Sequence, residues 1–278
     1  MKQGKALHHN IGIALWYNRE LNKALKGMFD DTLKTIVPTF TETIAQDSVF
    51  DITVELNKLR KKYVEFFYKY GKELAKKFIE RSIRHANISV KKAIEPIAKK
   101  EFKLAGSIIN EANRDIVTMA IYNNVSLIRS IPEEYYKNVT GIVSRSMQGG
   151  SIAEVEHELL KFIKLEGKKA RNRAKLIAYD QTRKVYSDIA LNKIKQAGFT
   201  KVMWLHSGGD KVPRCYHVNK WDGKSGLKNG RPNGLNGFVF EIDNPPVIQK
   251  ANGKRDEVRG FPAQLINCTC FLKPVDDE

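Results

Sequence analysis

The sequence predicts an α+β fold: a helical N-terminal region, then a C-terminal region that mixes helix with short strands and has a long loop-rich end. Two observations lead to this class. From Asp51 to Phe78, and again from Ala98 to about Ser130, apolar side chains recur at intervals of three and four residues, the period of an amphipathic helix. After Gly198 this period gives way to short apolar runs separated by glycine, asparagine and proline, as in strands and turns.

The first 130 or so residues are expected to be helical throughout. The first apolar series is rich in aromatic residues: Leu56, Leu59, Tyr63, Phe66, Phe67, Tyr70, Leu74 and Phe78. A stripe at this spacing either packs into a core or forms a docking face for a partner helix. Pro38, Pro96 and Pro132 are the expected breaks, because proline lacks the amide hydrogen that a helix interior uses.

Two more helices are expected after residue 150. Ser151 followed by Glu154 matches a capping box, in which the two residues satisfy amides of the first helical turn. Another helix is expected from about Ala170 to just before Gly198, because glycine readily adopts the left-handed backbone that closes a helix.

Short strands are expected at Val202 to Leu205, at Gly237 to Ile242 and at Cys270 to Pro274. A stretch rich in glycine, asparagine and proline, from Ser207 to Gly260, accounts for most of this region. Loops of this length are uncommon inside a compact domain. Either a partner surface or a bound metal is therefore expected to hold the stretch in place.

The composition indicates a folded, strongly basic chain. Its 48 lysines and arginines exceed its 31 acidic residues, so the formal net charge is +17, and 42% of its residues are hydrophobic. Such a charge favours nucleic acid, an acidic protein surface or anionic lipid as partner, unless the lysines form only a solvated surface. No apolar run approaches the roughly 18 residues of a membrane span, and no secretory leader is expected.

A candidate metal site uses all three cysteines, which lie near the C-terminal end. Its members are Cys215, His217, Cys268 and Cys270. Three thiolates and one imidazole are a ligand set that tetrahedral zinc accepts. A zinc ion here would close a polar loop of roughly 50 residues that has little core of its own.

Two interpretations without a metal remain open for the same residues. In the first, Cys268 and Cys270 pack as small hydrophobic side chains on a terminal strand. In the second, a hydrogen-bonded polar cluster pins the loop, and its members are Asp180, Asp210, Arg214, His217 and Asp222.

A basic run on the helical stretch after residue 160 is the candidate nucleic-acid surface. Its members are Lys161, Lys164, Lys168, Lys169, Arg171, Arg173 and Lys175. Contacts of this kind reach phosphates and carry no sequence preference. The alternative is a solvated helix face.

Several motifs between Pro132 and Val275 occur together in a characteristic order. They are MQGGSIAEVEHELLKF, then RAKLIAYDQTRKVYSDIALNKIKQAGFTKVMWLHSGGDKVPRCYHVNKWDG, which contains Arg214-x-x-His217 and Trp221-Asp222-Gly223, then Pro245-Pro246, and finally INCTCFLKPV. In this order they resemble the phage head morphogenesis family, the Mu F-like minor head proteins.

The resemblance implies a minor head protein of a tailed bacteriophage, present in few copies at the portal or the capsid interior. It implies action in head assembly, or in DNA packaging and ejection, after synthesis in the host cytoplasm. The expected partners are the portal protein, a major capsid or scaffold protein, double-stranded DNA and further copies of the chain. Residues 1–131 would form a helical docking region, and residues 132–278 the head morphogenesis domain.

No catalysis is expected. The resemblance also implies a distant relation to the ADP-ribosyltransferase fold, but the E-x-E triplets at residues 154–156 and 156–158 fall on the capped helix rather than on a strand. A nuclease could start from His206, His217 and Asn219, yet no paired carboxylates of a two-metal site accompany them. An ADP-ribosyltransferase-like enzyme or a nuclease delivered with the particle is the alternative reading.

Overall fold

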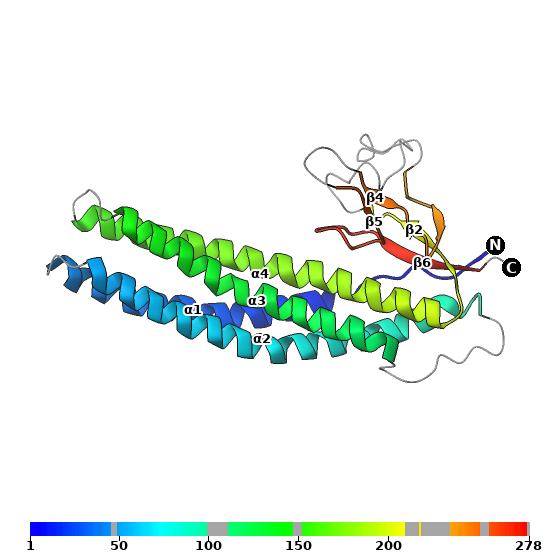
Figure 1. The fold of residues 1–278 in the computed structure, drawn as a ribbon, viewed down its shortest axis with the longest axis horizontal. Coiled ribbons are helices and arrows are strands. Elements are labelled where there is room, and N and C mark those ends of the chain that lie inside the picture. Colours follow the sequence, from blue (N-terminus) through cyan, green and yellow to red (C-terminus); the bar gives the residue numbers. More distant parts are fainter. Residues whose placement is uncertain are drawn as a thin grey trace. The chain divides into compact units, whose positions relative to one another are not determined.

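The computed structural model describes residues 1–45, 49–98, 111–146, 152–208, 217, 234–250 and 256–276, and it has the predicted α+β class (Figure 1). The helices are α1 (Ile11–Ala45), α2 (Val49–Ile94), α3 (Glu111–Ser146) and α4 (Ile152–Gln196). The strands are β1 (Lys2–Gln3), β2 (Lys201–Leu205), β3 (Val239–Glu241), β4 (Val247–Gln249), β5 (Val258–Arg259) and β6 (Phe271–Asp276).

The chain forms two compact units that are interleaved in sequence. Residues 14–78 and 120–179 form the helical unit, and residues 1–13, 79–119 and 180–278 form the mixed unit. The boundary expected after residue 131 falls inside α3.

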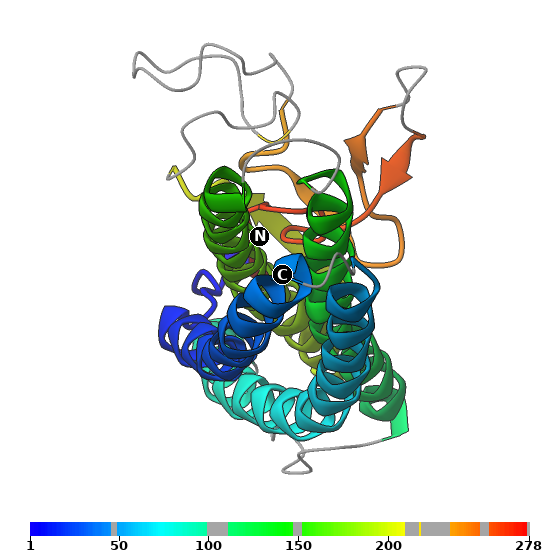
Figure 2. The same cartoon turned by 90° about the vertical axis from the view of Figure 1, so that its left-hand side faces the viewer.

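The helical unit is a bundle to which each of the four helices contributes a segment, seen end on in Figure 2. Side chains at intervals of three and four fill its interior, among them Tyr17, Phe67, Phe78 and Tyr136, each fully buried. Of the aromatic series predicted on α2, Phe66 is the member that turns outward, with 43% of its surface exposed. The helical period thus identified most of the face that α2 buries in this unit.

Two pairs of buried polar groups form hydrogen bonds inside the bundle. The hydroxyl of Tyr17 donates to Oδ1 of Asn124 at 2.9 Å, and the hydroxyls of Thr32 and Tyr136 lie 2.9 Å apart. Each pair joins helices more than 100 positions apart in sequence. Such pairs fix the register of the bundle, because a shift would leave a buried polar atom without a partner.

Two of the three expected helix breaks are wrong. Pro96 follows the end of α2, but Pro38 lies inside α1 and Pro132 lies inside α3. The flanks of Pro132 explain its position, since Ile131 and Tyr135 are both buried. Packing of an apolar face can outweigh the one hydrogen bond that proline removes.

The two helices expected after residue 150 are a single helix, α4. Its buried positions continue at helical spacing through the basic run, at Ile163, Ala170, Ala174 and Ile177, so nothing interrupts it. Its predicted end is confirmed: Gly198 has a φ of +83°, and its amide donates to the carbonyl of Lys195.

The mixed unit contains a four-stranded antiparallel sheet in the order β1-β6-β2-β3. Strands β2 and β6 form its centre, in register from Lys201 opposite Val275 to Leu205 opposite Phe271. All three predicted strands are therefore confirmed. A second sheet pairs β4 with β5.

Three strands were missed, and one of them overturns the prediction that helix begins at the N-terminus. Residues 1–10 are not helical, and β1 pairs with β6 at the other end of the chain. Strands of two or three residues are too short to show the alternating period of a sheet. Pairing with another strand, rather than the sequence of the strand itself, decides their conformation.

Within the described ranges, no helix combines the length and the apolar character that crossing a membrane requires.

Candidate metal centre

Three potential metal ligands from distant parts of the sequence meet in the interior of the mixed unit. His217, Cys268 and Cys270 are each 5% exposed or less, and their ligand atoms all lie within 4.8 Å of one another. Nδ1 of His217 is 3.6 Å from Sγ of Cys268 and 3.7 Å from Sγ of Cys270. These three residues form the His-Cys-Cys cluster.

The two cysteines are positioned by a tight turn that leads into β6. Ala263 and Asn267 both have positive φ angles, of 72° and 60°, and the amide of Cys268 donates to the carbonyl of Leu265 at 3.0 Å. The turn also aims the amide of Ala263 at Sγ of Cys268, 3.4 Å away. An amide that donates to sulfur favours the thiolate, which is the form that binds metals.

His217 is oriented by contacts on the side opposite the cysteines. Its Nε2 lies 3.3 Å from the carbonyl oxygen of Ile248, and its ring packs edge-on against Trp204 at 4.9 Å. Because a carbonyl only accepts, the proton of a neutral imidazole belongs on Nε2. The lone pair of Nδ1 then faces the two sulfurs, and a backbone partner of this kind commonly orients metal-binding histidines.

The surroundings of Cys268 favour its ionised form. A hydrogen bond from Cys270, together with one from the Ala263 amide, lowers the pKa of the Cys268 thiol despite the opposing effect of burial. A thiolate poised beside an imidazole lone pair is a typical metal-binding arrangement.

The geometry of the cluster fits zinc. Bonds of about 2.3 Å to sulfur and 2.0 Å to nitrogen, at tetrahedral angles, place sulfur and nitrogen about 3.5 Å apart. The two observed separations, 3.6 and 3.7 Å, are close to that value. The His-Cys-Cys cluster could therefore hold a metal such as zinc. The fourth predicted ligand, Cys215, lies outside the described residues.

The predicted polar cluster is only partly described. Asp210, Arg214 and Asp222 lie outside the described residues. Asp180 accepts from the amide of Asn267 at 2.9 Å and forms an ion pair with Lys184. Asp180 and His217 thus both act on the segment from residue 267 to 270, Asp180 on its backbone and His217 on its thiols.

A polar seam between α4 and the turn was missed from the sequence. The hydroxyl of Ser187 donates to the carbonyl of Pro262 at 2.8 Å, and Gln264 forms a side-chain hydrogen bond to Asp188. The available signal was polar residues at every fourth position of α4, namely Asp180, Lys184 and Asp188.

Replacing Asp188 with asparagine is expected to stabilise the protein at neutral pH. Burial raises the pKa of Asp188 to about 6 from 3.8, against the opposing effects of the Gln264 hydrogen bond and the Lys184 charge. A carboxyl whose pKa is higher in the folded than in the unfolded protein does not lower the free energy of unfolding at a pH below its unfolded pKa. At a pH above its folded pKa, it lowers that free energy by the full amount. The variant should gain about 1 to 2 kcal/mol at pH 7.5 and little at pH 3.5.

Thermal unfolding of both proteins between pH 3.5 and 8 checks this prediction. Asparagine keeps an oxygen that can accept from Gln264, so the comparison isolates the charge. A constant difference between the two proteins across this range would contradict it.

The basic run of α4 divides into two groups. Lys161, Lys164, Lys168, Arg171 and Lys175 follow one another at intervals of three and four and are exposed, and we call them the α4 basic stripe. Two members of the run lie off this stripe. Lys169 pairs with the buried Glu166 at 2.5 Å, and Arg173 pairs with Glu134 of α3.

The comparisons with known proteins leave the family open. No family model matches the chain, and no solved structure matches it. An uncharacterized protein of Haemophilus influenzae is 25% identical over 271 residues, which cover 95% of this chain and 53% of the relative. The chain therefore spans about half the length of the curated relative it matches.

Proposed function

We propose that the chain is a minor head protein of a tailed bacteriophage, located at the portal or capsid interior, that acts in head assembly or DNA delivery without catalysis. One observation carries the proposal. The motifs that resemble the Mu F-like family are separated in sequence, yet His217 of the second motif meets Cys268 and Cys270 of the last in one buried cluster. Convergence of this kind is expected when the motifs belong to one folded domain.

We further propose that zinc occupies the His-Cys-Cys cluster, with Cys215 as the fourth ligand, and that its role is structural. A catalytic zinc keeps one position open to substrate, whereas a structural zinc is enclosed by four protein ligands. All three described ligands are buried. The ion would tie the segment around His217 to the start of β6, where the sequence offers little apolar core.

Mass spectrometry of particles is the test of the head role. The intact chain should be found in both procapsids and virions, at a few copies per particle. The intact chain is required because deletion of residues 1–131 would cut α3 and would remove β1 from the sheet. Absence of the chain from both kinds of particle would contradict the head role.

The α4 basic stripe is the surface we propose for duplex DNA. Lys164, Lys168 and Lys175 are exposed, and no ion pair or hydrogen bond engages them among the described residues. Replacing all three with glutamate should weaken binding to a random duplex at least tenfold near 0.1 M salt. It should also reduce the slope of log affinity against log salt by about 3, because each phosphate contact releases roughly one counterion.

The matched control for this prediction makes the same charge change on α2. Lys58, Lys69 and Lys76 are also exposed, but each already pairs with a glutamate of its own helix. Electrophoretic mobility or fluorescence anisotropy across a salt series provides the measurement. Equal losses in the two triple variants would mean that net charge alone, rather than the stripe, attracts DNA.

A further inference from the structure

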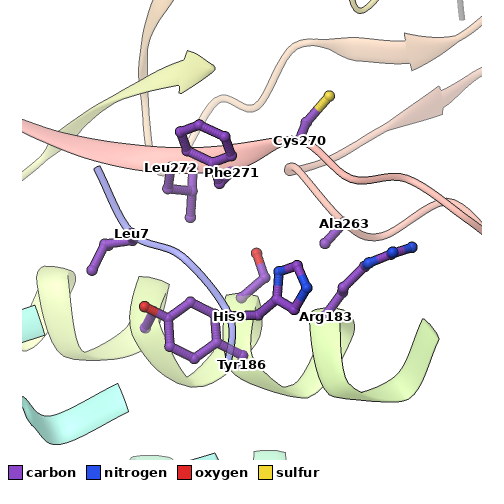
Figure 3. A pocket seen from close by; sticks show the side chains of 10 residues that line it. Leu7, His9, Arg183, Tyr186, Ala263, Cys270, Phe271 and Leu272 are labelled. Atoms are coloured by element: carbon purple, nitrogen blue, oxygen red, sulfur yellow. The ribbon is translucent and has the colours of Figure 1, made fainter. Parts of the chain in front are cut away.

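A small pocket in the mixed unit lies between the N-terminal segment, α4 and the start of β6. Leu7, Ala190 and Leu272 are among its apolar wall residues, and His9 and Arg183 are its basic ones. Figure 3 shows His9 and Arg183 next to each other above α4, with the Cys270 thiol pointing away from both. The pocket and the His-Cys-Cys cluster therefore lie on opposite sides of the chain at Cys270.

Among the residues that the structure describes, the basic groups of this pocket have no polar partner. Neither the His9 ring nor the Arg183 guanidinium makes a hydrogen bond or an ion pair within the described part of the chain, and Nε of Arg183 is buried without a partner. No carboxylate of a described residue lines the pocket. Its two hydroxyl groups are already engaged, that of Tyr186 with Ser89 and that of Ser187 with Pro262.

The neighbourhood of the pocket is electropositive. Burial, followed by the charge of Arg183 and the neighbouring His8 and His85, lowers the pKa of His9 to about 4. His85 donates from Nε2 to the carbonyl of His8 at 2.9 Å, and the ring of His8 packs on Phe271 at 4.3 Å. The guanidinium of Arg183 thus places a positive charge beside three imidazoles, where an anion would be attracted.

We propose that this pocket binds one phosphate group, held by the Arg183 guanidinium and the His9 imidazole. A guanidinium without a partner presents a fork of donors that matches two phosphate oxygens, and a neutral imidazole adds a third donor. The pocket measures about 270 Å³ including its open mouth, but its floor has room for only about one water molecule. A single phosphate oxygen can occupy the floor while the rest of the group stays at the mouth.

Titration of the intact protein with inorganic phosphate at pH 7 tests the proposal, followed by the NMR signals of the histidine rings and by calorimetry. The His9 signals should shift in a saturable way. Arg183→Gln should weaken phosphate binding at least tenfold, and Arg183→Lys should weaken it less, because it keeps the charge but loses the fork. Arg84→Gln, which removes an exposed arginine from α2, should leave the affinity unchanged.

Two further titrations identify the source of the phosphate. A short duplex without terminal phosphates will shift the same His9 signals if the pocket takes a phosphodiester of DNA. If only inorganic phosphate shifts them, the ligand is a free phosphate or a small phosphorylated molecule. Acetate binding as tightly as phosphate, a His9 signal that never saturates, or an undiminished affinity in a folded Arg183→Gln protein would each overturn the proposal. None of these outcomes depends on the head role or on zinc.

Discussion

Replacing Cys268 with alanine is expected to abolish stoichiometric zinc binding and to destabilise the mixed unit by about 3 kcal/mol or more. Cys268 accepts a hydrogen bond from Ala263, lies 3.6 Å from Nδ1 of His217, and is 2% exposed. Its loss removes one ligand and leaves the Ala263 amide buried without its acceptor. Because an ion bound only by the folded state stabilises that state, loss of the ion lowers the free energy of unfolding.

Native mass spectrometry and thermal unfolding measure the two parts of this prediction. The wild-type chain should carry one zinc ion that a strong chelator removes, with a fall in melting temperature as it leaves. A Cys268→Ala chain that kept one zinc ion would exclude Cys268 as a ligand. Unchanged melting after complete removal of the metal would instead exclude a structural role for the ion.

Two other variants make the comparison specific. Thr269→Ala, between the two cysteines, removes an exposed hydrogen bond to Ser207 and no proposed ligand, and it should retain the ion. Cys215→Ala tests the proposed fourth ligand directly: we expect it to weaken zinc binding strongly. Full zinc affinity in that variant would assign the fourth position to another group.

Adding a side chain at Gly4 is expected to have the second largest effect. A Cβ atom there would lie 2.3 Å from the carbonyl oxygen of Ala93 and 2.8 Å from Cγ of Pro274. The first contact is with backbone, which cannot rotate away, and the Gly4 amide is already bonded to the carbonyl of Pro274. Gly4→Ala should therefore cost about 3 kcal/mol, because the N-terminal strand must withdraw from β6 or the end of α2 must move.

The matched control places the same methyl group on α1. A Cβ atom at Gly27 would meet nothing within 4 Å, and the position is an exposed helix interior. Gly27→Ala should stabilise the helical unit by about 0.5 to 1 kcal/mol, because alanine loses less backbone entropy than glycine in a helix. Denaturant unfolding of the three proteins gives both values. A neutral Gly4→Ala variant would show that β1 contributes nothing to the stability of the sheet.

The sequence by itself determined the parts of this protein that depend on local periodicity. The aromatic series of α2 predicted a helix and most of its buried face, and Gly198 predicted the end of α4. The apolar run from Val202 to Leu205 predicted β2, one of the two central strands of the sheet. Each of these signals lies within one helix or one strand, where the spacing of side chains dictates which of them can be buried together.

Cys268, Cys270 and His217 show what the sequence could only narrow down. Their types and spacing allowed a metal site, buried thiols or a polar cluster, and nothing local separates these possibilities. The tertiary structure brings all three into one cluster. It orients the His217 imidazole by a hydrogen bond from Nε2 to the carbonyl oxygen of Ile248. Ligand geometry depends on contacts made by residues about 50 positions apart, and sequence spacing does not encode them.

Tertiary structure alone decided where the prolines and the N-terminal segment belong. Helix α3 continues through Pro132 because buried neighbours on both sides hold the flanking turns in place. Residues 2 and 3 are a strand because β6, at the other end of the chain, offers an edge to pair with. The same pairing brings His9 beside Arg183, so the pocket between them exists only in the folded chain. Long-range packing and pairing outweighed local preference at each of these places, because burial and hydrogen bonds across the fold contribute more free energy than the conformational bias of a few residues.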